Sequence, residues 1–185
     1  MNHKKWVVVL ALIATALILT HLPVSEADAA VSASDFLIEG STLTKYRGTD
    51  ERVTIPDTVE VVGESAFENN QKVQLVVVPK SVKRMDAYVF WGCDNLEEVV
   101  LGKGLTSVDE YAFSGCTGLK QITIPENVQS IDAQAFAGCT NLTDIYIPDT
   151  VTSIADDAFL NCDNVTIHAL SLIHIAEPTR LALIS

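Results

Sequence analysis

Apolar residues return along this chain at a fixed interval of 23 positions, with polar residues between them. Phenylalanine occupies one position of the interval each time: Phe67, Phe90, Phe113, Phe136 and Phe159. Three positions later the chain has Asn70, Cys93, Cys116, Cys139 and Cys162, and three further on a branched aliphatic residue returns. A run in this register does not arise by chance, and it marks five repeats of one unit over 53–167.

The length of the interval predicts the fold. A period of about 20 to 29 residues with this content is typical of a leucine-rich-repeat solenoid. Alternation at 145–147 predicts a short strand in each coil, and Pro148 ends it because proline cannot donate to a sheet ladder. Ala158 and Phe159 are expected on a short helical turn, and the five phenylalanines are expected to stack in one buried row. The predicted fold class is a leucine-rich-repeat solenoid of 23-residue coils, each a short parallel β-strand plus a short helical turn.

The first coil needs a cover, because a repeat of this kind buries its apolar face only against a neighbour. Residues 30–52 are predicted to form that N-terminal cap. Within them, two alternating runs at 35–39 and 42–46 flank Gly40 and Ser41, which favours a β-hairpin. At the other end the pattern fails, since the next coil would need an apolar residue at 168 and has His168.

The first 29 residues have the pattern of a secretory signal peptide. Lys4 and Lys5 precede an apolar run at 6–19, and small residues follow at 27–29. The alternative is a retained membrane anchor, but the run has about 14 residues and a spanning helix needs about 20. The mature chain is therefore expected to be secreted, without membrane insertion after signal cleavage, or held at the cell surface through a missing C-terminal region.

The end of the chain has a different pattern. The stretch LSLIHIAEPTR at 170–180 closely resembles an in-frame translation of a transposase adapter used in sequencing libraries, with a departure at Ala176. The alternative is a native tail. Residues 168–185 are thus predicted to be non-native and the chain a truncated fragment. Its last strand, near 145–147 or just after, would then present an uncapped edge through which the fragment is expected to self-associate.

The repeat also resembles a known family. The stretch IPENVQSIDAQAFAGCTNLTDI is similar to the BspA-like, treponemal-type leucine-rich repeat, and the opening FLIEGSTLTKYRG resembles the segment that precedes such arrays. The resemblance covers 35–167 and departs at Gly102, where the pattern has proline, and at Asn70, where it has cysteine. It implies an exported or surface protein of a host-associated microbe, and characterised members are adhesins or binding proteins.

Charge and composition narrow the function classes. The net charge of −12 argues against nucleic acid and anionic membrane as partners, since both need clustered positive charge. Outside the predicted signal peptide and tail the chain has one histidine, His168, and it has no motif of a hydrolase, zinc protease or phosphate-binding loop. The sequence therefore predicts no enzyme, no cofactor and no metal site. Asp109, Asp132 and Asp156 are expected to face solvent.

The four cysteines share one repeat position, so they are expected to form a ladder along the inner wall. A buried free thiol behaves as a small apolar group, and this interpretation is favoured. Bridges between neighbouring coils and metal binding are the alternatives.

The outward residues of the strands give the candidate binding surface. Three rows are expected to face outward, and within them Leu75, Val77 and Val100 would form a small apolar patch, with Lys80 and Lys103 beside it and Tyr146 further along. An apolar patch rimmed by charge is typical of protein-binding surfaces. The predicted function is binding of a protein or other surface macromolecule. The alternative is a spacer or accessory array of a larger surface protein or enzyme whose active domain is missing.

Overall fold

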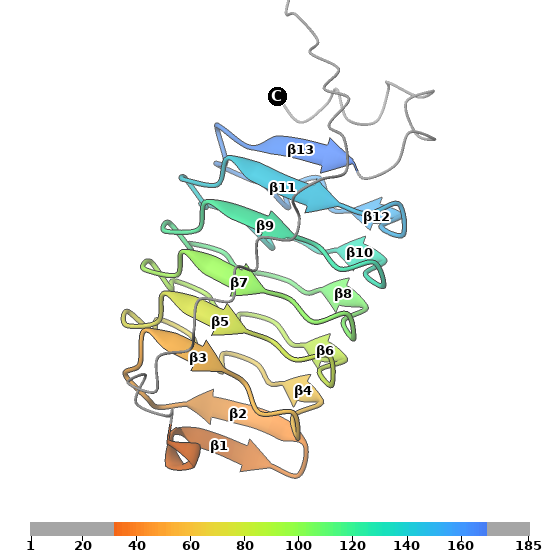
Figure 1. The fold of residues 1–185 in the computed structure, drawn as a ribbon. Coiled ribbons are helices and arrows are strands. Elements are labelled where there is room, and N and C mark those ends of the chain that lie inside the picture. The colour runs from red at the N-terminus through yellow and green to blue at the C-terminus, as the bar shows by residue number, and fades with distance from the viewer. Residues whose placement is uncertain (1–31, 170–185) are drawn as a thin grey trace, which may run out of the picture. The chain divides into compact units, whose positions relative to one another are not determined.

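The computed structural model describes residues 32–169, which form one β-solenoid (Figure 1). The predicted signal peptide at 1–29 and residues 170–185 of the predicted tail lie outside the described residues. The elements are the 3-10 helix η1 (Ala33–Asp35) and the strands β1 (Phe36–Glu39), β2 (Thr42–Tyr46), β3 (Arg52–Thr54), β4 (Val61–Val62), β5 (Leu75–Val77), β6 (Arg84–Met85), β7 (Glu98–Val100), β8 (Ser107–Val108), β9 (Gln121–Thr123), β10 (Ser130–Ile131), β11 (Asp144–Ile147), β12 (Ser153–Ile154) and β13 (Thr166–Ala169).

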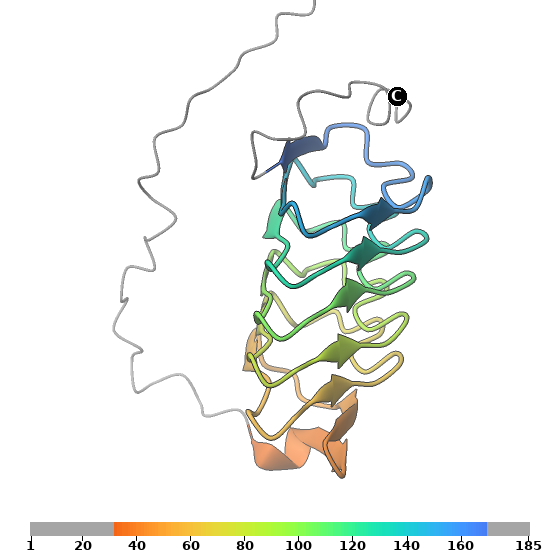
Figure 2. The ribbon, with the colours of Figure 1, turned by 90° about the vertical axis from the view of Figure 1, so that its right-hand side faces the viewer.

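The coils stack so that strands one repeat apart lie side by side and parallel (Figures 1 and 2). The longer strands form one wall, as the three-stranded groups β3-β5-β7 and β9-β11-β13. Two-residue strands form a second wall, with β4 and β6 following the longer β2 and with β8-β10-β12 beyond them. The sequence did not predict these two-residue strands. Val53 pairs with Val76 and Val76 with Val99, so the register follows the 23-residue interval of the sequence.

The expected helical turn at the Ala-Phe position is wrong. The segment is a series of hydrogen-bonded turns with left-handed residues on both sides of the phenylalanine. The first left-handed position holds Ser65, Tyr88, Tyr111 and Gln134, and the second holds Asn69, Gly92, Gly115, Gly138 and Asn161. A right-handed helix cannot continue through such residues.

The backbone hydrogen bonds of this turn explain why it is not a helix. The Phe67 N–H donates to the Val89 carbonyl of the next coil at 2.9 Å, and the Asn69 N–H donates to the Trp91 carbonyl at 2.7 Å. Between them, the Glu68 N–H donates back to the Ser65 carbonyl. Alternate N–H groups therefore donate to carbonyls of the next coil. In an α-helix each of these N–H groups would instead donate to the carbonyl four residues earlier in the same segment.

The core is a column of stacked aromatic rings. All five repeat phenylalanines are buried, and successive ring centroids lie 5.0–5.4 Å apart. This spacing follows from the distance of about 4.8 Å between hydrogen-bonded strands. The predicted row is confirmed, and it continues further than predicted, because Tyr46 stacks on Phe67 at 5.1 Å and Phe36 packs on Tyr46.

The predicted hairpin is present at the N-terminal end. Strands β1 and β2 pair antiparallel, and β2 then pairs parallel with β4, so the hairpin extends the wall of short strands. Leu43 and Tyr46 of β2 are buried against the first coil. The Tyr46 hydroxyl donates to Asp50 at 2.9 Å, and burial together with this bond raises the pKa of the phenol above its usual value. The hairpin thus covers the apolar end of the solenoid.

The C-terminal end departs from the sequence expectation. The apolar position expected at 168 lies at 167 instead, because β13 pairs with β11 after a step of 22 residues, Ile145 with Ile167 and Tyr146 with His168. The link into the strand is one residue shorter than in the preceding coil: one residue separates Val165 from Ile167, whereas two residues separate the equivalent Leu142 from Ile145. The strand runs through residues 168 and 169, which the sequence assigned to the tail, and it lies over β11, whose edge was expected to be open.

The cysteines form a ladder of free thiols. Cys93, Cys116 and Cys139 are buried and Cys162 is half-buried. Each Sγ–H donates to the carbonyl of the phenylalanine 26 residues earlier, as Cys116 does to Phe90 at 3.1 Å. Burial raises the pKa of the Cys93 thiol to about 12, and it raises the pKa of Cys116 well above its ordinary value.

These thiols are expected to react slowly in the folded protein. The thiolate is the reactive form, and burial suppresses both its formation and its access to reagent. Native titration with a thiol reagent should therefore label the half-buried Cys162 first and the other three only on unfolding, when four thiols react. The variant Cys162→Ser should lose the early phase alone. Rapid labelling of all four in the native state, or no thiol after unfolding, would contradict the ladder.

Candidate functional site

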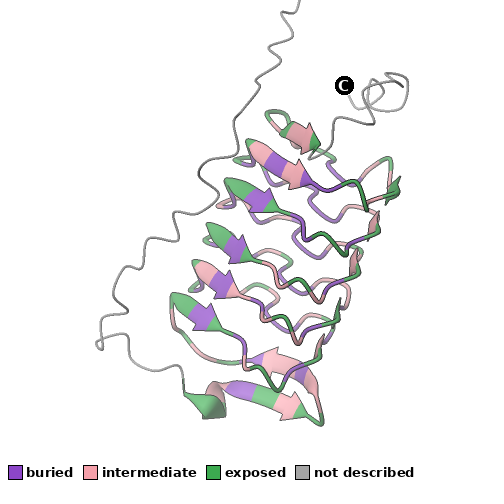
Figure 3. Ribbon diagram, turned by 45° about the vertical axis from the view of Figure 1, so that its right-hand side comes forward, coloured by how far each residue is buried: buried purple, intermediate pink, exposed green. Residues whose placement is uncertain are grey.

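The long strands present a periodic outer face, as the alternation predicts. Figure 3 shows a buried band along the strands, flanked by exposed or half-buried residues. The outward row between the last two apolar positions of each coil is Thr54, Val77, Val100, Thr123 and Tyr146, and none of these residues is buried. The pleat alone produces this arrangement, since successive side chains of a strand point to opposite faces.

The structure brings the predicted apolar residues together on β5 and β7. Val77 and Val100 are register partners on these adjacent strands, and Leu75 is two residues before Val77. Val100 is 39% exposed, while Leu75 and Val77 are half-buried. These three residues therefore form a small apolar patch, in which Val100 is the most exposed side chain.

The two lysines follow these strands closely. Lys80 and Lys103 are exposed and occupy the same position in successive coils. The backbone at Gly102 lies directly on the carbonyl of Pro79, so the two loops touch and the lysines lie next to each other. The Lys103 ammonium lies 3.8 Å from a carboxylate oxygen of Glu126, and both side chains are highly exposed. Such a pair contributes little to stability and leaves the lysine available.

Tyr146 does not belong to the same patch. It lies on β11, in the other group of long strands, and its ring stacks on His168 of β13 with centroids 4.6 Å apart. The His168 Nε2 is 2.7 Å from Asp144 Oδ1. This hydrogen bond, together with one from Thr143, lowers the pKa of the Asp144 carboxyl. The sequence missed His168 as a neighbour because the last step is 22 residues and not 23.

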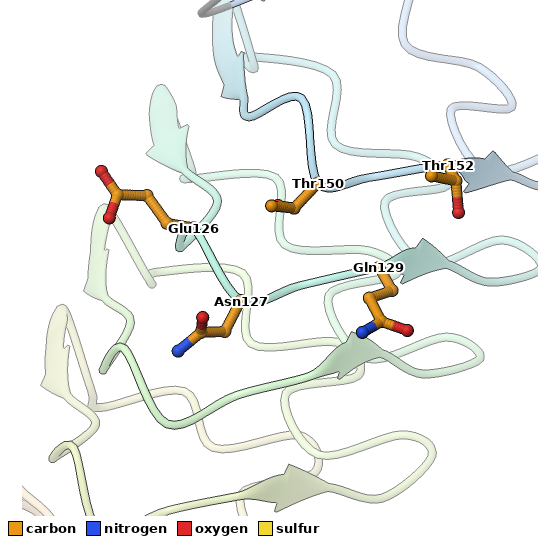
Figure 4. Close-up of a pocket in the computed structure, with 5 residues that line it drawn as sticks. All are labelled: Glu126, Asn127, Gln129, Thr150 and Thr152. Atoms are coloured by element: carbon orange, nitrogen blue, oxygen red, sulfur yellow. The ribbon is translucent and has the colours of Figure 1, made fainter.

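Two shallow hollows lie beside the strands, and neither gathers reactive groups. The first is lined by Glu126, Asn127, Gln129, Thr150 and Thr152 of two neighbouring coils (Figure 4). The figure shows these side chains spread along the surface without converging on one point. The Asn127 amide already donates to the Lys103 carbonyl at 2.7 Å. In the second hollow, the Lys120 ammonium pairs with Glu97 at 2.8 Å.

No catalytic or metal constellation stands out in the part of the chain that the structure describes. Residues 32–169 contain no group of three or more His, Cys, Asp or Glu side chains placed to hold a metal ion. Within the same range, no helix is long and apolar enough to cross a membrane.

One expectation about the carboxylates is wrong. Asp156 is exposed as expected, but Asp109 and Asp132 are half-buried beside the short strands. The Ser107 hydroxyl donates to Asp109 at 2.6 Å. Burial raises the pKa of the Asp109 carboxyl, and the neighbouring carboxylates of Asp132 and Asp86 add to the shift. The repeat places like charges in a row, which the sequence could have revealed from their 23-residue spacing.

Comparison with known proteins agrees with this geometry. The model of the BspA type leucine-rich repeat region matches residues 45–166 in six copies. No curated protein sequence matches the chain.

Solved structures give the same picture. A leucine-rich cell surface protein from Faecalibacterium prausnitzii is 31% identical with a TM-score of 0.70, and the match covers 78% of this chain and 38% of that one. The leucine-rich repeat protein of T. pallidum is 27% identical with a TM-score of 0.71, covering 74% of this chain and 69% of that one. The pneumococcal vaccine antigen PcpA, 20% identical with a TM-score of 0.63 over 74% of this chain and 35% of that one, shares the fold. The chain thus spans well under half of two of these relatives.

Proposed function

Because the chain belongs to the BspA-type leucine-rich repeat family, we propose that it is a non-catalytic, secreted or cell-surface module that binds another macromolecule through the face of its long strands. The family is one of repeat proteins of the bacterial surface type, and a related structure is that of a leucine-rich cell surface protein. Solenoids of this kind offer extended surfaces that suit protein recognition.

The observation that carries the proposal is the patch on β5 and β7. Val77 and Val100 lie side by side and outward, where the equivalent residues of β3 and β9 are Thr54 and Thr123. An exposed apolar pair in this setting, next to the adjoining Lys80 and Lys103, resembles the apolar centre and charged rim of a small interface. The proposed site residues are Leu75, Val77, Lys80, Val100 and Lys103, with Tyr146 as an outlying contact.

The test begins with a partner captured from an extracellular protein mixture such as plasma and identified by mass spectrometry. The double variant Val77→Glu and Val100→Glu should then weaken binding of that purified partner by about tenfold or more, since the carboxylates would have to be desolvated at the contact. Its melting temperature should stay close to that of the parent, because neither side chain is part of the core.

The chain supplies a matched control away from the patch. The double variant Thr150→Glu and Thr152→Glu adds the same charge to exposed positions in the loop between β11 and β12. It should leave the affinity within about twofold of the parent, since these positions lie two coils beyond Val100 and off the long strands. If partner binding survives the change at Val77 and Val100, the strand patch is not the site. A chain that captures nothing would favour the role of a spacer.

A further inference from the structure

A second surface feature lies at the turns that follow the short strands, and it is aromatic. Tyr88 and Tyr111 of successive coils stack nearly parallel, with centroids 4.8 Å apart and 5° between their planes. Trp91 meets Tyr88 edge-on at 6.5 Å and 85° and is 39% exposed. Figure 2 shows these turns along the edge of the solenoid away from the long strands. The three rings, named here the aromatic edge, therefore lie apart from the patch on β5 and β7.

The turn itself does not require aromatic residues. At the position of Tyr88 and Tyr111, the other coils have Ser65 and Gln134, with the same left-handed backbone. At the position of Trp91, the next two coils have Ser114 and Ala137. The buried phenylalanine column already fills the interior beside these turns. The aromatic edge is thus an addition to the fold at two coils only, and a partly exposed tryptophan has no evident structural need there.

The surroundings of the aromatic edge are acidic. The five turn segments at 63–69, 86–92, 109–115, 132–138 and 155–161 contain no lysine, arginine or histidine. Their carboxylates are Glu64, Glu68, Asp86, Asp109, Glu110, Asp132, Asp156 and Asp157. Two cations reach these turns from other parts of the coils: Arg84 pairs with Asp86 at 2.6 Å, and the Lys45 ammonium donates to the Ser65 carbonyl at 2.8 Å. Carboxylates therefore outnumber cations at the turns, whereas Lys80 and Lys103 lie beside the long strands.

We propose that the aromatic edge binds a lysine- or arginine-rich segment of a partner protein. A guanidinium or ammonium over the face of Trp91 or a tyrosine gains a cation–π contact, and the flanking carboxylates of Asp109 and Glu110 favour the same charge. The aromatic faces supply specificity for a flat guanidinium, which also stacks on rings. The half-buried carboxylate row would be relieved of like-charge repulsion when a cation binds beside it. This surface is separate from the strand patch and of opposite charge.

The probe for this proposal is fluorescein-labelled hexa-arginine, followed by anisotropy. The peptide should bind saturably at low salt and more weakly as salt rises, because exposed charges are screened. In a Trp6→Phe background, where Trp91 is the single tryptophan, the unlabelled peptide should also shift the Trp91 emission. Hexa-glutamate should do neither.

The repeat provides substitutions that these turns already tolerate. Trp91→Ser and Tyr111→Gln introduce the residues found one coil later, at Ser114 and Gln134, and each should weaken hexa-arginine binding by about tenfold. The control is Leu160→Ser, at the same register as Trp91, 47% exposed and three coils away, which should leave the affinity unchanged. Two independent variants keep the test decisive if one of them loses its fold, as judged by the melting temperature.

The opposing outcomes are distinct. Binding of hexa-arginine that neither Trp91→Ser nor Tyr111→Gln weakens would mean that charge alone attracts the peptide, and it would overturn the proposal. A shift of Trp91 emission with neutral chito-oligosaccharide but not with hexa-arginine would make the edge a sugar-binding surface and overturn it equally. Absence of any binding at low salt would do the same. Each result is independent of the strand patch, because Val77→Glu with Val100→Glu leaves these residues untouched.

Discussion

Replacing Phe113 by alanine is expected to lower the free energy of unfolding by about 3–5 kcal/mol. The ring is fully buried at the centre of the aromatic column, stacked on Phe90 at 5.3 Å and on Phe136 at 5.2 Å. Its removal leaves a cavity that the two neighbouring coils cannot close, because their backbones are fixed by hydrogen bonds on both sides of the ring. Urea denaturation followed by circular dichroism measures the loss.

Two comparisons show whether the column explains that loss. Phe159→Ala should lower the free energy of unfolding by less than Phe113→Ala does. The Phe159 ring is slightly more exposed and stacks on one phenylalanine, Phe136, among the described residues. Leu160→Ala, next along the chain but 47% exposed, should change stability by less than about 0.5 kcal/mol. A loss below about 1 kcal/mol for Phe113→Ala would mean that the ring does not contribute to the core as its burial implies.

The sequence predicted the repeat and its interior well because both depend on periodicity. Every coil must present the same residue to the same neighbour, so the 23-residue interval identified the phenylalanine column and the buried cysteine position directly. The helical turn was wrong for a local reason. Left-handed residues interrupt it, and several of them are not glycine but Ser65, Tyr88 and Gln134, which carry no clear signal for that conformation.

The candidate surface was predicted less completely. Alternation along the strands placed Val77 and Val100 outward and Tyr146 further along, but it could not reveal that the Tyr146 ring stacks on His168. That contact depends on a step one residue shorter than the repeat. The aromatic edge was missed although Tyr88 and Tyr111 are 23 residues apart. The tyrosine recurs in two coils only, with Ser65 and Gln134 on either side, so it gives a much weaker periodic signal than the phenylalanine two residues later.

Gly102 gives the clearest case in which sequence and structure lead to opposite expectations. The equivalent position holds Pro56, Pro79, Pro125 and Pro148 in the other coils, so the repeat pattern alone suggests that Gly102→Pro restores the consensus. Consensus substitutions and proline at compatible sites commonly stabilise proteins by about 0.5–1 kcal/mol. The structure opposes this, because a Cβ atom at Gly102 would fall on the carbonyl oxygen of Pro79 in the preceding coil and crowd the Lys80 nitrogen.

We therefore expect Gly102→Pro to destabilise the solenoid by about 1–3 kcal/mol, as overpacking against a rigid backbone does. The loop cannot move away easily, since Gly104 makes a second close approach to the carbonyl oxygens of Lys80 and Val82. Gly102→Ala adds the same Cβ without the proline ring and should lose stability to a similar extent, which separates the contact from any effect of the ring. Urea denaturation of both variants beside the parent measures the change. A gain in stability for Gly102→Pro would show that the two loops do not touch and that the repeat pattern alone decides this position.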